Sequence, residues 1–376
     1  MNQIDTPAPT LFDLLARQWR CSAAVATVTF NADLSAVAFA CADGSLTIAP
    51  MDDAEPPESR IRVSVESGRS TIVPRDKAIP PASIVEPFGG LPLTIAPFGA
   101  SGFVAGGAGG QLVRIDPRGH VTPFAARMNG PVVGLAHHAA SGRTACAAAG
   151  AVALFQGEDT REPLRFAPEA RVAALALSPD GSELALAHAK GLSLWRLGDS
   201  PALSAEIPFD GDPVGLSWSP DGAWIACTLA ADGFRLVRLS DGAGETLSKY
   251  PTPVHSFAWN RAENALATSG AFRVAAWSLA VPPLDGDIRG VLQTGRSGLV
   301  VVESVAAHPS RNLLAVGYAN GLVNIAQIGK PDELMILQDG SGAINALAWS
   351  GDGRHVALGT ADGKAAIVSF PSNMFK

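Results

Sequence analysis

Apolar and polar positions follow one recurring pattern along most of the chain. A short apolar run is followed by a tight turn, an alanine-rich stretch, a second small turn and another apolar run. The clearest copy, at residues 172–197, reads VAALALSPDGSELALAHAKGLSLWRL. Short apolar runs bounded by turn residues in this way predict β-strands. Further copies begin at residues 25, 93, 132, 213, 254, 302 and 344.

The spacing of the copies predicts a β-propeller. Most adjacent copies are about 40 residues apart, the length of a four-stranded blade, with longer steps after the first copy and before the seventh. The first run mixes small and large residues, as expected of an inner strand crowded near a central axis. In the turn, Pro179 fixes φ, Asp180 bonds the local backbone and Gly181 accepts a positive φ. Segments such as 163–166 and 333–337 supply a fourth, outermost strand.

Eight copies predict an all-β ring of eight four-stranded blades. Seven blades with one irregular copy is the alternative, because the second copy is rich in glycine. The last copy ends at Phe370 without an outer strand, and residues 15–21 (LARQWRC) can supply one. The two ends of the chain would then share a blade and close the ring. We take residues 1–376 as a single propeller domain with an inserted segment at about 51–90.

The repeats resemble those of a known family. The SPDG turn with its following strand, and a third strand that starts at a DG pair and ends on a large apolar residue, resemble the WD-repeat family over residues 22–370. The resemblance implies a propeller that binds other proteins on its faces. No Gly-His dipeptide precedes the first strand and no blade ends in Trp-Asp, so the family's Asp–His–Ser–Trp hydrogen-bond network is not carried over. TolB-like propellers use a similar repeat and are the related alternative.

Composition restricts the partners. Charged residues make up 17% of the chain and the formal net charge is −7, which argues against nucleic acid as a partner. The first residues lack the pattern of a signal peptide, and no run of 18 apolar residues could span a membrane. The four cysteines are far apart and form no CxxC pair. We therefore expect a soluble protein of a reducing cytoplasm that binds neither nucleic acid nor membrane.

Aligned copies give two columns of candidate contact residues. The resemblance places the second residue of each first strand at the rim of one face, near the channel mouth. This column is small or apolar in the first five copies and polar in the last three, which predicts a polar contact site at His255, Glu303 and Asn345. The second column is predicted to be a loop after the second strand, opening on the same face, and it includes His188 and Tyr318. An exposed tyrosine is a common anchor in interfaces; the alternative is that these are ordinary loop residues.

The inserted segment predicts an extra β-hairpin. An acidic, proline-rich start is followed by the alternating stretch 60–66 and by residues 70–75, which flank Ser-Gly-Arg at 67–69. We expect the hairpin to lie over the face opposite the two columns. It is either an arm that binds a partner or a hairpin that packs on its own ring.

No motif in the chain specifies a reaction. None of the seven histidines has zinc-ligand spacing, and His137, His138 and His308 are expected to be turn residues rather than metal ligands. The glycines at 106–110 lie between two strands with no helix after them, so they predict a hairpin turn rather than a phosphate cradle. There is no GxSxG elbow. We predict no catalytic, cofactor-binding or metal-binding residue.

Two functions remain. The leading hypothesis is a non-enzymatic protein–protein interaction scaffold that uses the faces of the ring. The rival hypothesis is a propeller enzyme, or a binder of a small ligand or metal, at the central channel around His255, Glu303 and Asn345. A periplasmic TolB-like role is a third possibility, and it conflicts with the absence of a signal-peptide pattern.

Overall fold

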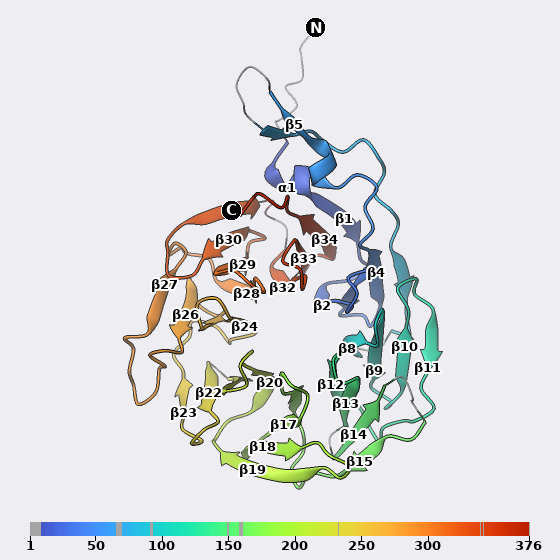
Figure 1. Cartoon of the computed structure of the whole chain (residues 1–376), viewed down its shortest axis with the longest axis vertical. Helices are drawn as coiled ribbons and strands as arrows, with labels where there is room; N and C mark the ends of the chain where they lie inside the picture. Colours follow the sequence, from blue (N-terminus) through green and yellow to red (C-terminus); the bar gives the residue numbers. More distant parts are fainter. Residues whose placement is uncertain are drawn as a thin grey trace.

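Eight four-stranded antiparallel sheets stand around a common axis and form a ring (Figure 1). The computed structural model describes residues 9–64, 70–90, 93–148, 150–157, 161–231, 233–338, 340 and 342–375. The prediction of an all-β propeller with eight blades is confirmed, and the alternative of seven blades is wrong. The described helical segments are the short helix α1 (Leu11–Leu15) and one 3-10 turn (Pro57–Arg60).

The blades, numbered 1 to 8 in chain order, share one strand plan. The inner strands are β2 (Val25–Phe30), β8 (Leu93–Phe98), β12 (Val132–His138), β16 (Ala174–Leu177), β20 (Pro213–Trp218), β24 (Phe257–Asn260), β28 (Val302–Ala307) and β32 (Ile344–Trp349). The second strands are β3 (Ala36–Cys41), β9 (Gly102–Gly107), β13 (Arg143–Ala148), β17 (Glu183–His188), β21 (Trp224–Leu229), β25 (Ala265–Thr268), β29 (Leu313–Tyr318) and β33 (His355–Thr360). The third strands are β4 (Leu46–Pro50), β10 (Leu112–Ile115), β14 (Ala151–Gln156), β18 (Gly191–Arg196), β22 (Phe234–Arg238), β26 (Val274–Ser278), β30 (Val323–Gln327) and β34 (Lys364–Ser369). The outer strands are β7 (Ser83–Val85), β11 (Val121–Pro123), β15 (Leu164–Phe166), β19 (Ala202–Pro208), β23 (Gly244–Leu247), β27 (Val291–Thr294), β31 (Glu333–Leu337) and β1 (Ala16–Arg20).

The hydrophobic core lies between the blades. Every residue of β3 is buried, because both of its sides face a neighbouring blade, and its side chains at 36, 38 and 40 are alanines. Small side chains let two sheets approach closely, and larger ones fill the space around them. One cluster joins Phe39 of blade 1 to Ile367 of blade 8. The alternation of small and large residues in the sequence therefore sets the contact between blades.

The two ends of the chain share blade 8, as predicted. Strand β1 pairs antiparallel with β34, from Ala16 opposite Val368 to Arg20 opposite Lys364. This strand comes from the amino-terminal segment, whereas β32, β33 and β34 come from the carboxy-terminal repeat. The ring is thus closed by a non-covalent joint between the first and last parts of the chain.

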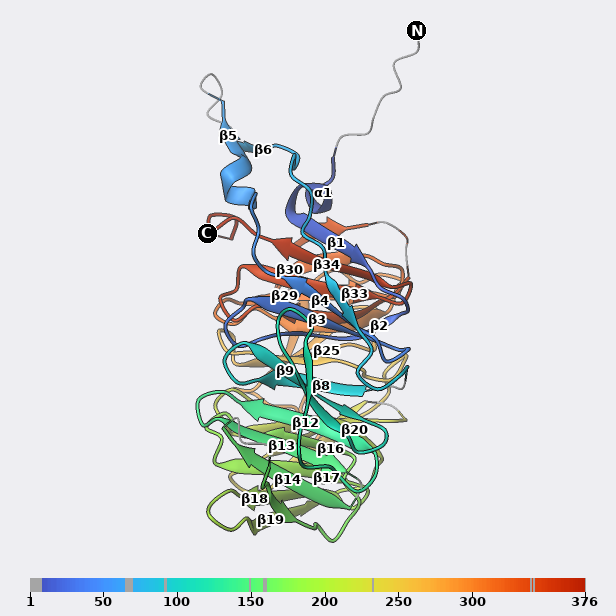
Figure 2. The ribbon, with the colours of Figure 1, turned by 90° about the vertical axis from the view of Figure 1, so that its right-hand side faces the viewer.

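The inserted segment lies outside the ring, beside this joint. Strands β5 (Ile61–Val63) and β6 (Ser70–Ile72) pair antiparallel, and the turn expected at 67–69 falls outside the described residues. Figures 1 and 2 show β5 with α1 at the outer edge of the closing blade. The expectation that the hairpin covers a face is therefore wrong, and the physical reason is a set of arginine contacts that fix the segment at the perimeter.

Arg17 of β1 is the centre of these contacts. Its side chain is 1% exposed, and its Nη1 donates to the carbonyls of Pro50 (3.0 Å) and Asp52 (2.9 Å). Its Nη2 donates to the carbonyl of Met51 at 3.1 Å, and its Nε lies 3.7 Å from Asp53 Oδ2. One buried guanidinium thus binds the closing strand to the end of blade 1.

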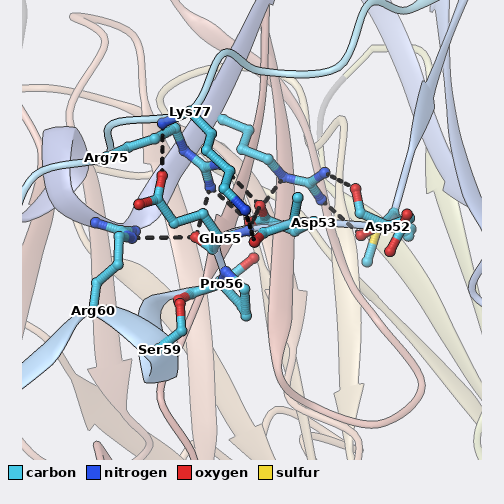
Figure 3. Close-up of polar contacts among 12 residues, drawn as sticks. Asp52, Asp53, Glu55, Pro56, Ser59, Arg60, Arg75 and Lys77 are labelled. Atoms are coloured by element: carbon cyan, nitrogen blue, oxygen red, sulfur yellow. Dashed lines mark hydrogen bonds and ion pairs between the residues drawn. The ribbon is translucent and has the colours of Figure 1, made fainter.

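Two further arginines hold the insertion in place. Arg75 donates from Nη1 and Nη2 to the two carboxylate oxygens of Asp53, at 2.9 and 2.7 Å. Arg60 donates from Nη2 to the carbonyl of Leu14 at 2.6 Å and from Nη1 to that of Val73 at 2.7 Å. Its Nε donates to the carbonyl of Glu55 at 3.2 Å (Figure 3). Burial by itself would raise the pKa of Asp53, but the hydrogen bonds from Arg75 and the charge of Arg17 hold that pKa below its usual value. We call Arg17, Asp53, Arg60 and Arg75 the closure latch.

The turn after the inner strand is built by its serine and aspartate. Ser178 Oγ donates to Asp180 Oδ1 at 2.6 Å and accepts from the backbone N–H of Glu183 at 2.9 Å. Ser219 and Ser350 make the same pair of bonds in blades 5 and 8. These bonds satisfy the backbone where the chain reverses, so the SPDG pattern has a direct structural cause.

In blade 7 a histidine takes the place of this serine. His308 Nδ1 accepts from the backbone N–H groups of Ser310 (3.2 Å) and Arg311 (3.1 Å), so the prediction of a turn residue is confirmed. Its ring lies against Trp349, with centroids 4.8 Å apart, and against Gly353 in the turn of blade 8. A Cβ built on Gly353 would be 2.5 Å from the imidazole, and this glycine has a φ of +71°. Neither the backbone nor the neighbouring blade therefore accommodates a side chain there.

Replacing Arg17 by leucine is expected to lower the free energy of unfolding by about 3 kcal/mol or more, because three backbone carbonyls lose the donor that Arg17 supplies and Asp53 loses a charge partner. Arg20→Leu is the matched control on the same strand. The Arg20 side chain is 68% exposed and pairs with Asp362 at 3.4 Å, so its loss should cost about 1 kcal/mol or less. Urea unfolding followed by tryptophan fluorescence measures both variants, and equal costs would contradict the latch.

Gly353→Ala is expected to destabilise the chain by about 2 kcal/mol, since the methyl group meets a histidine that is fixed by two hydrogen bonds and φ is positive. Gly351→Ala, in the same turn, has open space around its Cβ and should change stability by about 0.5 kcal/mol or less. Thermal unfolding of the two variants in parallel tests this. A Gly351→Ala variant that is as unstable as Gly353→Ala would show that the turn, and not the contact with His308, sets the cost.

Candidate functional site

The first predicted column coincides with a β-bulge in the inner strands. In five blades the ladder between the inner and second strands skips one inner-strand residue just after the strand begins. A bulge leaves one residue out of the ladder and changes the direction of its side chain. The skipped residues are the column members Ala26, Val133, Val214, Glu303 and Asn345.

The three polar members of this column lie at the same end of neighbouring inner strands. His255 and Asn345 are exposed, and Glu303 is half-buried. In blade 6, Ser269 Oγ accepts from the backbone N–H groups of both His255 and Ser256 at 3.1 Å. Here a side chain, and not the backbone ladder, binds the start of the inner segment to the second strand. Blades 6, 7 and 8 thus present one polar residue each at an end of the inner strand, as the alignment of the copies predicts.

Hydrogen bonds between neighbouring inner strands fix these positions. Ser256 Oγ accepts from the backbone N–H of Val305 and donates to its carbonyl, both at 3.1 Å. Equivalent bonds at the next two seams are Ser304 Oγ to the Ile344 carbonyl (2.6 Å) and Asn345 Nδ2 to the Val25 carbonyl (3.2 Å). Asn345 therefore fastens blade 8 to blade 1, whereas His255 and Glu303 each directly precede a serine that bonds to the next blade.

The second predicted column is not a loop. Its members are buried and most of them are the last residues of second strands, where they pair with the first residue of the inner strand, as Tyr318 pairs with Val302. The expectation that His188 and Tyr318 are exposed is wrong: each is 6% exposed. The second strand continues to the level of the bulge and packs between blades there, so the connecting loop starts after these residues.

Tyr318 instead joins two blades. Its hydroxyl donates to Glu333 Oε1 at 3.3 Å, and the same carboxylate accepts from Asn324 Nδ2 at 2.9 Å and from the backbone N–H of Arg296 at 3.1 Å. Burial, together with the Glu333 charge, raises the pKa of Tyr318. Arg296 follows the outer strand of blade 6, so this network ties blade 6 to blade 7. Its role is structural rather than one of surface recognition.

His188 lies at one wall of a groove in blade 4. Its Nδ1 accepts from the backbone N–H of Lys190 at 3.3 Å, and burial lowers its pKa. The groove has a volume of about 630 Å³ and is lined also by Trp195 and Glu206. The structure therefore separates His188 from His255, Glu303 and Asn345, which belong to the inner strands of later blades.

Two exposed apolar residues at this end were missed in the sequence. Phe272 is 44% exposed in the connection that follows the second strand of blade 6, and Leu299 is 95% exposed in the connection from blade 6 to blade 7. Backbone bonds from Gly298 N to the Phe272 carbonyl (3.1 Å) and from Val302 N to the Ala271 carbonyl (2.9 Å) hold the two connections together. An apolar residue within a glycine- and serine-rich loop was the available signal.

These residues adjoin the polar column. Val302 precedes Glu303, and it is bonded to the connection that carries Phe272. Val214, the bulge residue of blade 5, is 57% exposed. We define the blade 5–7 rim as Val214, His255, Phe272, Leu299 and Glu303.

The remaining predicted features have structural roles. His138 is the last residue of β12, directly before the turn in which it was predicted. Its Nδ1 bonds Ser141 Oγ at 2.8 Å and its Nε2 bonds the Pro179 carbonyl of the next blade at 2.9 Å. Gly107 and Gly110 close the hairpin between β9 and β10, as predicted. Among the described residues, no three or more His, Cys, Asp and Glu side chains are grouped closely enough to hold a metal ion. Within the same part of the chain, no helix has the length and apolar character needed to cross a membrane.

Comparisons with known proteins agree with this architecture. The model of the family described as WD domain, G-beta repeat, matches residues 332–368, which run from the outer strand of blade 7 into the third strand of blade 8. No curated protein matches the chain in sequence.

Solved structures cover nearly the whole ring. The computationally designed Ika8 protein is 16% identical with a TM-score of 0.62, over 93% of this chain and 98% of that one. The β-propeller domain of Cps50 (Swd1) from Myceliophteria thermophila is 12% identical with a TM-score of 0.55, over 95% of this chain and 100% of that one. At these identities the likeness concerns the fold. Residues 332–368 are thus similar to a WD repeat, and the chain as a whole is an eight-bladed β-propeller.

Proposed function

We propose that this propeller is a non-enzymatic protein–protein interaction scaffold that binds its partner through the blade 5–7 rim. The observation that carries the proposal is the exposure of Leu299 and Phe272 beside the bulged inner-strand positions. A leucine that is 95% exposed gains no burial from its own fold. Apolar side chains grouped with polar ones at a surface are typical of a site for another protein.

The scaffold beneath the rim supports this use. Inner strands that are bonded to each other at every seam from blade 6 to blade 1 hold the rim in one arrangement. Rigid presentation lowers the ordering cost of binding. The aromatic ring of Phe272 and the side chain of Leu299 would supply buried contacts, and the carboxylate of Glu303 would favour a basic group on the partner.

We also propose a reducing cytoplasm as the compartment. All four cysteines are free thiols and are buried in the structure. Structural disulfides are rare in that compartment.

Replacing both Phe272 and Leu299 by aspartate is expected to reduce capture of a bound protein from cell extract at least tenfold, or about 1.4 kcal/mol. Ile288→Asp is the matched control: Ile288 is 71% exposed in another connection of blade 6, before the outer strand. Quantitative mass spectrometry compares what the wild type and the two variants retain. Proteins kept by the wild type and by Ile288→Asp, but lost from the double variant, identify the partner.

Equal capture by all three proteins would overturn the assignment of the rim. A second measurement addresses the rival function. Protein purified without chelator should hold no stoichiometric metal, and His255→Ala with Glu303→Ala should not change its metal content. Stoichiometric metal that is lost in this variant would replace the scaffold by a metal site at the inner strands.

A further inference from the structure

Two of the four cysteines meet at the joint that closes the ring. Cys21 follows the closing strand β1, and its backbone N–H donates to the Gly363 carbonyl of blade 8 at 2.8 Å. Cys41 is the last residue of β3 in blade 1. The two side chains lie in one buried cluster and hydrogen-bond to each other. A thiol–thiol contact therefore connects the end of the closing strand to the first blade.

The backbone holds both thiols in register. Cys41 is the ladder partner of Val25, and the N–H of its neighbour Ala42 donates to the Ala24 carbonyl at 2.8 Å. Beside Cys21, Ser22 Oγ lies 2.7 Å from Ser45 Oγ. The backbone N–H of Cys41 donates to the carbonyl of the same Ser45 at 2.9 Å. Both sides of the contact are thus fixed by hydrogen bonds that do not involve the sulfur atoms.

We propose that Cys21 and Cys41 are a redox-sensitive pair that forms a reversible disulfide when the protein meets hydrogen peroxide. In the first step, the Cys41 thiolate attacks one peroxide oxygen, the O–O bond breaks, and hydroxide leaves as a sulfenic acid forms on Cys41. In the second step, the sulfur of Cys21 attacks that of Cys41, and the sulfenic oxygen leaves as water. Overall, two thiols and one peroxide give one disulfide and two molecules of water. A dithiol reductant reverses the change.

The hydrogen bond assigns the two roles. The interaction with Cys21 lowers the pKa of the Cys41 thiol and raises the pKa of the Cys21 thiol. Cys41 is therefore the nucleophile and Cys21 the resolving thiol. Peroxide is the oxidant that suits a buried pair, since it is not much larger than water.

The other two cysteines are internal controls. Cys146 lies in β13 and Cys227 in β21, in two different core clusters. Burial raises the pKa of each to about 12. Neither has a thiol partner, and both should remain reduced under conditions that oxidise the pair.

Peptide mapping of the full chain after peroxide treatment tests the proposal. Cys21 and Cys41 share one tryptic peptide, residues 21–60, because no lysine or arginine lies between Cys21 and Arg60. The expected result is a loss of two hydrogens from this peptide, restored by dithiothreitol, with Cys146 and Cys227 still alkylatable. A peptide 21–60 that keeps its mass, or that gains oxygen irreversibly, while the chain is oxidised elsewhere would overturn the proposal.

Variants and stability give a second measurement. The double variant Cys146→Ser, Cys227→Ser keeps the pair and should show the same two-hydrogen loss. Cys21→Ser should leave Cys41 unable to form the disulfide, so that peroxide produces sulfenic or higher acids on Cys41 alone. The oxidised wild type should unfold at a higher temperature than the reduced protein, because the disulfide constrains the unfolded chain. Unfolding temperatures that do not differ would show that the link does not strengthen the joint.

Discussion

The joint between blade 8 and blade 1 is the constraint on which the structure depends. Each blade buries both of its faces against neighbours, so a ring that failed to close would expose two apolar sheet faces to water. The closing strand β1 is only five residues long, and its ladder to β34 is short. The buried guanidinium of Arg17 adds three hydrogen bonds to carbonyls of blade 1. A charged group is tolerated there because Asp53 and these carbonyls compensate for its lost hydration.

Polar bracing in this ring lies largely between blades rather than inside them. The indole Nε1 of Trp218 donates to the Ala176 carbonyl of blade 4 at 3.0 Å, and that of Trp259 donates to Ser217 Oγ of blade 5 at 3.1 Å. Together with the Ser256 bonds to Val305, these contacts form a belt that links the inner strands of blades 4 to 7. Ser256 directly follows the rim residue His255, so the geometry of the rim depends on contacts between blades as well as on single blades.

The blades could be predicted from sequence because their causes are local. Turn chemistry at Ser178 and Asp180 acts over a few residues, and small residues at alternate positions indicate a strand packed between sheets. The prediction that Tyr318 lies in an exposed loop was wrong for an equally local reason. Tyr318 is the last residue of its strand, and an error of one residue in the strand end exchanges a buried side chain for an exposed one. The position of the insertion depends on bonds from Arg60 and Arg75 to residues that are distant in the sequence. Local sequence patterns do not predict such bonds.

The rim and the joint occupy different parts of the ring. Val214, His255, Phe272, Leu299 and Glu303 come from blades 5 to 7 and their connections, whereas Arg17, Cys21 and Cys41 lie at the seam of blades 8 and 1. Asn345 is the one polar member of the column that belongs to that seam, since its side chain donates to the carbonyl of Val25. A change of redox state at the cysteine pair therefore acts first on the strength of closure. An effect on a partner at the rim would have to pass through the hydrogen bonds between inner strands. Because these bonds hold the strands rigidly, opening of the ring would alter the rim more than a small displacement at the joint would.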